Sequence, residues 1–324
     1  MNLKDLTLVC LTLNRHDRVI KQLNYFANKP IDIIIADGSK KKWQFSNQGF
    51  KGAMNWRYFN YNHLNNNSKN YITRWLRASK MIRTKYAMML DDSDIYYWSG
   101  IKKTLSFLKS NKSYKVATGI SAIGYITNNK LFCISQTSPK QILNFDNSSS
   151  TKRLSYMINN QFSGNIFYSI IEANLFKEVI KKTCDTKLSL DVMYELKFCS
   201  LLLIKSKFKF LTVPFHLRMV IPKLFKCQKD NIEKNNVNYW IKNKKKEFIE
   251  YKNYLIKSLT TQKVNLIDAN LCINNFFKTY IKHYNFKFKA KQSFLDLMLG
   301  KKLSLHIKPK IQKIFDYFFD KPIE

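Results

Sequence analysis

Apolar runs and helical patterns alternate along the first third of the chain. Each apolar run is short, rich in β-branched or aromatic residues and ended by polar residues, which predicts a strand. These strands are expected at residues 6–13, 31–36, 56–61 and 86–90. Between them, apolar residues recur every third or fourth position, which predicts helices over about 19–27, 68–84 and 100–110. Such alternation is typical of an α/β fold with a mostly parallel, Rossmann-like central sheet.

The rest of the chain divides into two parts. Strands are expected at 116–120 and 208–213, helices at about 173–182 and 189–205, and breaks at Pro214 and Pro222. From about residue 226 glycine almost disappears, and aromatic residues stand in helical groups among lysine and asparagine. We therefore expect a sheet domain over 1–225 and a basic, aromatic-rich helical region over 226–324.

Polar clusters follow three of the predicted strands. They are Thr12-Leu13-Asn14-Arg15, Asp37-Gly38-Ser39 and Asp91-Asp92-Ser93-Asp94. In a parallel sheet, ligands bind beyond the carboxyl ends of the strands, so the clusters should converge on one rim. Asp37 could accept hydrogen bonds from a nucleobase or ribose, and Arg15 could bind phosphate. The alternative is ordinary turn polarity, which Asp-Gly-Ser suits well.

The cluster Asp91-Asp92-Ser93-Asp94 carries three carboxylates within four residues. They repel one another unless a cation neutralises them, and a divalent ion bound to a diphosphate is a natural partner. Asp92 and Asp94 have the DxD spacing and are the candidate metal ligands, while Asp91 and Asp92 would also face a bound donor. The alternative is an exposed turn, or a helix N-cap formed by Ser93 or Asp94.

Two further groups could take part in chemistry. Arg74, Arg77 and Lys80 lie on the helix before the acidic strand, and one of them, with Arg74 as the candidate, could reach a diphosphate. Asp191 and Glu195 are four residues apart and share a helix face. Either could act as the general base that a hydroxyl acceptor requires. A solvated basic face and a helix-dipole acid are the respective alternatives.

Composition adds a strong positive charge. The formal net charge is +34 and the isoelectric point about 9.9. Part of this excess lysine fits an AT-biased genome, and part could hold the protein against an anionic membrane. The six cysteines show no CxxC spacing, which argues against zinc and fits a reducing cytosol. With no signal peptide and no apolar run of about 20 residues, we expect a cytoplasmic protein that lies on a membrane at most.

The three clusters, in this order, resemble those of the GT-A glycosyltransferases, over roughly residues 5–220. The likeness is strongest to a bacterial subgroup with an Asp-rich triplet, and it extends to Phe167–Ile171, Tyr194–Leu196 and Leu217-Arg218. The resemblance implies a nucleotide-sugar donor, UDP-linked, a Mn²⁺ or Mg²⁺ ion and a glycan or lipid-linked acceptor. It places Thr12 and Asp37 at the donor nucleotide, Asp92 and Asp94 in the DxD motif, and Glu195 as the base.

The sequence departs from this subgroup in three places. Ser93 replaces the middle Asp of the triplet, so Asp91-Asp92 and Asp92-Asp94 both remain candidate pairs. Ile95 stands where the motif ends in an aromatic residue, and the region after about 226 has no counterpart.

The function expected is an inverting, metal-assisted glycosyltransferase of bacterial surface polysaccharide synthesis, at the inner face of the plasma membrane. One alternative is a nucleotidyltransferase on a similar sheet. The other is a basic nucleic-acid-binding protein. No nucleic-acid module is recognisable and the lysines are spread throughout, so no specific nucleic acid is expected.

Overall fold

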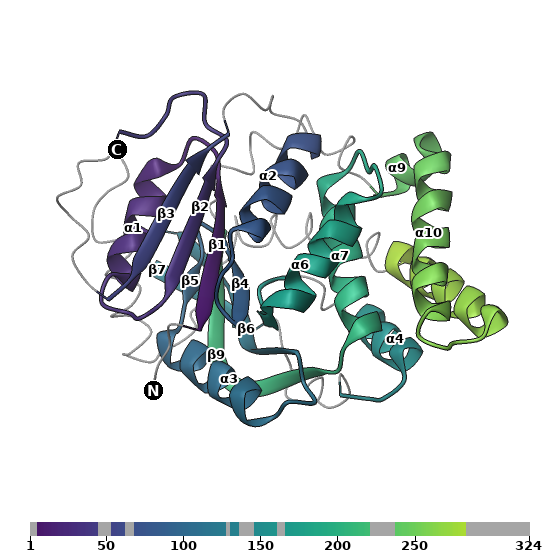
Figure 1. The fold of residues 1–324 in the computed structure, drawn as a ribbon. Helices are drawn as coiled ribbons and strands as arrows, with labels where there is room; N and C mark the ends of the chain where they lie inside the picture. Colours follow the sequence, from purple (N-terminus) through teal and green to yellow (C-terminus); the bar gives the residue numbers. More distant parts are fainter. Residues whose placement is uncertain are drawn as a thin grey trace.

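A computed structural model describes residues 5–44, 53–61, 68–127, 130–135, 146–160, 166–220 and 237–282. Its centre is a nine-stranded sheet in the order β3-β2-β1-β4-β8-β6-β9-β5, with β7 paired to β6 (Figure 1). Helices cover the sheet, so the expected α/β class with a mostly parallel central sheet is confirmed.

The first four strands are parallel and form the half of the sheet that carries the predicted polar clusters. They are β1 (Leu6–Thr12), β2 (Asp32–Asp37), β3 (Asn55–Asn60) and β4 (Tyr86–Leu90). Thr12 pairs with Asp37, and Cys10 pairs with Leu90, the last residue before the acidic cluster. Strand β4 is buried throughout, as its continuous apolar sequence predicts for a parallel sheet covered on both faces.

The second half of the sheet is mixed. Its strands are β5 (Ile95–Tyr96), β6 (Val116–Thr127), β7 (Lys130–Ser135), β8 (Ile170–Glu172) and β9 (Phe208–Val220). Strands β6 and β9 run parallel, whereas β8 pairs antiparallel with both β4 and β6. The short β5, directly after the acidic cluster, pairs antiparallel with β9. This pairing joins the acidic cluster to the far end of the sheet.

Strand β9 corrects the expectation that Pro214 ends a strand. It continues through Pro214 to Val220, and the β6–β9 ladder shifts register around Ile120, opposite Pro214. Proline has no N–H to give to a ladder, so it is tolerated where the ladder is irregular. Gly100 packs directly on the Pro214 carbonyl, where any added Cβ would collide. Pro222 lies outside the described residues.

Helices lie on both sides of the parallel strands. Figure 1 shows α1 (His16–Phe26) on one side of β1–β3 and α2 (Ser68–Lys80) on the other. Helix α3 (Trp98–Ser110) contacts α1 through the rings of Phe26 and Trp98, whose centroids are 6.4 Å apart. Helices α6 (Ala173–Cys184), α7 (Asp191–Lys205) and α4 (Ser150–Asn160) extend the layer that α2 begins.

The part of the C-terminal region that the structure describes, residues 237–282, is helical. It comprises α9 (Val237–Asn243), α10 (Lys245–Thr260) and a helix over 266–282, which Figure 1 places beyond α7 from the strands. Tyr251, Leu255 and Leu259 of α10 are fully buried. In the described ranges, no helix has the length and apolar character needed to cross a bilayer.

Candidate active site

The acidic loop, Asp91–Asp94, follows β4 and meets the end of β1. The Thr12 hydroxyl donates a 2.7 Å hydrogen bond to Asp92 Oδ2. The Arg15 guanidinium lies 3.2 Å from Asp92 Oδ1, and its side chain is 41% exposed. The first and third predicted clusters are therefore in direct contact, with Arg15 open to solvent at the rim.

Asp91 is held in place by hydrogen bonds, and its two carboxylate oxygens differ in the number of donors that they accept. Its Oδ1 accepts hydrogen bonds from the backbone and hydroxyl of Ser93, whereas Oδ2 has a 3.3 Å contact with the Tyr168 hydroxyl. Its backbone N–H donates to the Tyr96 hydroxyl. Burial alone would raise the pKa of Asp91, but the hydrogen bonds from Ser93 lower it below the usual value.

Asp94 is buried beneath the loop, with both oxygens engaged by β9. His216 Nε2 lies 2.7 Å from Oδ2, and the Met219 backbone N–H donates to Oδ1 at 2.9 Å. Gln22 of α1 donates to the Asp94 carbonyl at 2.6 Å. Asp94, which the sequence nominates as a metal ligand, thus fastens the loop to β9 and α1 in this structure.

The buried carboxylates of the acidic loop act on one another electrostatically. Burial, followed by the charge of Asp91, raises the pKa of Asp92 to about 6 and also raises that of Asp94. Within the described ranges, no three Asp, Glu, His or Cys side chains gather as a ready metal site. An all-oxygen donor set of one or two carboxylates fits Mg²⁺ or Mn²⁺, which take further ligands from phosphates and water.

Asp37 ends β2 and is fully buried among protein donors. Its Oδ1 accepts from the backbone and hydroxyl of Ser39. Its Oδ2 accepts from the Tyr58 hydroxyl at 2.8 Å and lies 2.7 Å from His16 Nε2. Burial acts to raise the pKa of Asp37, but these hydrogen bonds, led by those of Ser39, lower it. In this structure the Asp37 carboxylate, predicted to accept hydrogen bonds from a nucleobase or ribose, is the centre of a hydrogen-bonded group of protein side chains.

Aromatic rings surround Asp37. The Trp43 ring stacks on His16 with centroids 5.5 Å apart and an interplanar angle of 11°. It meets the Tyr58 ring edge-on at 6.0 Å. We call His16, Asp37, Ser39, Trp43 and Tyr58 the Asp37 cluster. Flat rings beside a strand end offer a surface on which a nucleobase can stack.

Two other predicted residues connect the strand ends. Asn14 has a left-handed φ of 54°, a conformation that asparagine tolerates, and its N–H donates to the Ser39 hydroxyl. Arg74 is buried and donates to the Thr12 carbonyl at 2.8 Å. It packs against Gly38, where a Cβ would collide with the guanidinium. Arg77 and Lys80 are exposed, so of the three basic residues predicted to reach a diphosphate Arg74 is the one at the strand ends.

Glu195 is a half-buried carboxyl on α7 within the electrostatic reach of the acidic loop. Burial raises its pKa to about 7, Arg218 opposes the shift, and the charges of Asp91 and Asp191 add to it. Although burial opposes it, the pKa of Arg218 is raised by the nearby carboxylates of Asp94, Glu195 and Asp91. Asp191 is exposed one turn earlier on the same helix. A carboxyl with a pKa near 7 can accept a proton under ordinary conditions.

Several residues that build this site had no local signal in the sequence. Gln22, Tyr168 and His216 come from α1, the segment before β8, and β9, and they meet at the acidic loop only in the folded chain. Tyr58 reaches Asp37 through the pairing of β2 with β3, whereas His16 comes from the start of α1 and Trp43 from the segment after β2. The resemblance named Tyr168 and Arg218 only as parts of longer stretches.

No protein-family model matches the sequence, and no curated protein matches it. Crystal structures of S. aureus TarS align with the chain at low identity. The first has a TM-score of 0.39 and 14% identity over 79% of this chain and 43% of its own, so this chain spans less than half of it. TarS 1–349 gives a TM-score of 0.45 and 12% identity over 94% of both chains. Its complex with UDP gives 0.41 and 12% over the same shares. Likeness at this level carries no functional assignment, which rests on the residues described above.

Proposed function

We propose that this protein is a glycosyltransferase that moves a sugar from a nucleotide-sugar donor, UDP-linked, to a hydroxyl of a glycan or lipid-linked acceptor in bacterial surface polysaccharide synthesis. The observation that carries the proposal is the convergence of the acidic loop, the Asp37 cluster and Arg74 at the carboxyl ends of β1, β2 and β4. Glu195, with its pKa near 7, lies within electrostatic reach of that convergence.

The Asp37 cluster supports a nucleotide at the end of β2. Its stacked rings suit a nucleobase, and its half-buried His16 and Tyr58 can add hydrogen bonds to a base or ribose. Asp37 would orient Tyr58 and His16 toward the nucleotide, because both hydroxyl and imidazole are fixed on its carboxylate. Thr12 and Asn14 would line the same wall, with Arg15 and Arg74 supplying positive charge for the diphosphate.

The acidic loop would hold the Mn²⁺ or Mg²⁺ ion. Sequence spacing nominates Asp92 and Asp94, but both oxygens of Asp94 already accept from β9. Asp91 and Asp92 each keep one oxygen with a single long partner, at 3.3 Å and 3.2 Å. We therefore favour Asp91 and Asp92 as direct ligands, with Asp94 fixing the loop. When bound, such an ion supplies positive charge to the departing diphosphate.

Glu195 would act as the general base. It takes the proton of the acceptor hydroxyl while that oxygen forms a bond to the anomeric carbon. The bond from this carbon to the diphosphate breaks on the opposite side, and the nucleoside diphosphate leaves with the electron pair. The single displacement inverts the anomeric configuration. Burial keeps the pKa of Glu195 high, and the negative charge of Asp191, one turn away, adds to that shift.

The protein would also bind peripherally to an anionic membrane, at the inner face of the plasma membrane. The support is a corner of the C-terminal region where Leu266 is 61% and Ile267 80% exposed, next to Lys263. Exposed aliphatic side chains in a strongly basic protein suit shallow insertion among acidic headgroups.

Nucleotide binding is tested first, with the thermal unfolding of the full chain in the presence of UDP, GDP, ADP or CDP, with and without Mn²⁺. We expect one nucleoside diphosphate to raise the melting temperature selectively, with a larger shift when Mn²⁺ is present. Asp91→Asn should abolish the Mn²⁺-dependent part of the shift. Equal shifts for all four nucleotides in the wild-type protein would contradict a nucleotide-sugar site.

Transfer is then measured with the matching nucleotide-sugars. Glu195→Gln should retain nucleotide binding and lose transfer, because the base is not a donor contact. A nucleotidyltransferase would use phosphate as the nucleophile and have no need of this base, so nucleotidyl transfer that survives in Glu195→Gln would favour that alternative.

A further inference from the structure

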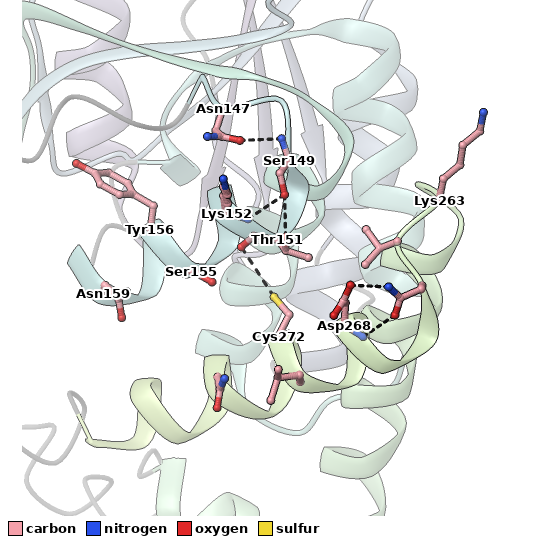
Figure 2. A pocket seen from close by; sticks show the side chains of 14 residues that line it. Asn147, Ser149, Thr151, Lys152, Ser155, Tyr156, Asn159, Lys263, Asp268 and Cys272 are labelled. Carbon is pink, nitrogen blue, oxygen red and sulfur yellow. Dashed lines mark hydrogen bonds between the residues drawn. The ribbon is translucent and has the colours of Figure 1, made fainter.

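A second candidate site lies away from the acidic loop, in a groove between α4 and the C-terminal helices. Its volume is about 830 Å³, and its walls are the segment 147–159 and the segment 263–275 (Figure 2). The Cys272 thiol, 3.9 Å from the Thr151 carbonyl, joins the two walls at the base. None of the residues assigned to transfer lines this groove.

Neutral polar side chains dominate the groove. Four asparagines line it, Asn147, Asn159, Asn265 and Asn275, together with hydroxyls that include Thr151 and Ser155. Each amide both donates and accepts hydrogen bonds, as does each hydroxyl. Within the described ranges, the structure gives the exposed amides of Asn159 and Asn275 no hydrogen-bond partner. The lining therefore suits a ligand that itself presents many groups able both to donate and to accept.

The charges of the groove argue against a simple anion or a nucleic acid. Lys152 and Lys263 come from opposite walls, the Lys263 side chain extends away from the other labelled side chains, and Asp268 lies on the same wall as Lys263 (Figure 2). Three charged groups of mixed sign leave a net charge of +1. Phosphate polymers are held by several convergent cations. An apolar peptide helix would need an apolar groove, whereas the aliphatic side chains that line this groove are Val264 and Leu271.

We infer that this groove binds a saccharide chain. A sugar presents hydroxyls to the amides and its C–H faces to aliphatic side chains, and Leu271 is 59% exposed along the groove. Planar amides and hydroxyls make hydrogen bonds to such a ligand without the cost of burying an ion.

The groove is firmly attached to the helix that carries Glu195. Arg153 of α4 is buried and donates to the carbonyls of Leu203 and Ile204 at the end of α7. A chain held in the groove would therefore be tethered to the same rigid body as the proposed base. This part of the inference rests on the proposed function: the bound saccharide is the acceptor polymer, and tethering raises the local concentration of its reactive end.

The test begins with binding of the full chain to a printed array of bacterial capsular and cell-wall glycans of defined sequence. The chain bound best is then titrated calorimetrically against wild-type protein and variants. Asn159→Ala with Asn275→Ala should weaken binding roughly tenfold, since two hydrogen bonds are lost. The control is Asn274→Ala, which removes the adjacent amide of the same helix outside the groove, together with the hydrogen bond that it accepts from Lys252.

Kinetics separate a tether from a structural effect. With a long acceptor, the double variant should raise KM roughly tenfold and leave kcat unchanged, whereas a monosaccharide acceptor should show no change. No glycan retained by the wild-type protein, equal losses in Asn274→Ala, or a matching KM change with the short acceptor would each overturn the inference.

Binding in Glu195→Gln distinguishes the two proposals. Groove-dependent glycan binding in a protein that transfers no sugar would uphold the groove and remove the proposed function. Sugar transfer by the wild-type protein, together with glycan binding that is unchanged in the double variant, would uphold the proposed function and remove the groove.

Discussion

At the scale of single residues, the carboxylates of the site divide by how fully their oxygens are occupied. Asp37 and Asp94 accept close protein donors on both oxygens and hold neighbouring segments in place, whereas Asp91 and Asp92 each have one oxygen with only a long partner. Asp91, Asp92 and Glu195 are the ones with capacity for a ligand, an ion or a proton. A DxD spacing cannot make this distinction, because it reports only that carboxylates are near each other along the chain.

Glu195 makes a pH prediction. Because its pKa is near 7, the deprotonated form of Glu195 becomes more populated as the pH rises. The pH profile of kcat/KM should therefore have a rising limb centred near pH 7, followed by a plateau. Glu195→Gln should lower kcat on the order of 10²- to 10⁴-fold and remove this limb. The profile is measured by donor turnover between pH 5 and 9 in buffers of constant ionic strength.

Substitution of Asp191 should shift the rising limb of that pH profile. Its negative charge raises the pKa of Glu195, so Asp191→Asn should move the limb to lower pH. Glu178→Gln removes a charge on α6 and should leave the limb in place. A limb that stays at the same pH in Asp191→Asn, or that survives in Glu195→Gln, would show that another group titrates.

At the scale of elements, α7 is held at its start and at its middle by neighbouring helices. Glu247 of α10 accepts from the backbone and hydroxyl of Ser189, just before α7, and from the Trp240 indole. Lys197 is fully buried, with its ammonium 3.8 Å from the Tyr254 ring centroid and bonded to the end of α6. The C-terminal helices therefore help to place the helix that carries Glu195.

Removing the Glu247 carboxylate tests that support. Glu247→Ala should lower the free energy of unfolding by about 1 kcal/mol, because three donors lose their acceptor at a partly exposed position. Glu250→Ala, on the exposed side of the same helix, removes an equal charge and should have little effect. Urea unfolding followed by tryptophan fluorescence measures both. Equal destabilisation would assign the effect to net charge instead.

Elements with a strong local pattern were predictable. The strands β1, β2 and β4 and helices α6 and α7 lie close to their expected positions because each has a dense apolar pattern. Strand β5, strand β7 and the passage of β9 through Pro214 were not, since they are defined by partners far away in sequence. The three polar clusters were placed correctly on one rim by parallel-sheet topology alone, but their hydrogen-bond partners were not.

At the scale of the whole molecule, the charge of +34 and the exposed aliphatic corner make one prediction about membranes. The full chain should float with vesicles of phosphatidylglycerol and phosphatidylethanolamine, and less so with vesicles of phosphatidylcholine alone. Ile267→Asp should lower the partition coefficient onto anionic vesicles roughly tenfold, because the aliphatic side chain that enters the interface is lost.

The control for that prediction is Gln262→Asp, an equal change of charge at an exposed polar position on the same corner. Equal losses in both variants would reduce the interaction to electrostatics. The absence of binding to anionic vesicles would remove the membrane from the proposed function.

The fastening of Asp94 by β9 also sets an order of events during synthesis. Its partners His216 and Met219 lie 122 and 125 residues further along the chain. A ribosome takes roughly 6 to 25 seconds to add 125 residues at about 5–20 residues per second. Throughout that interval the first four strands can already exist while their acidic loop lacks its anchor. A truncated or unfinished chain would thus carry every sequence motif of the donor site and still be unable to use it.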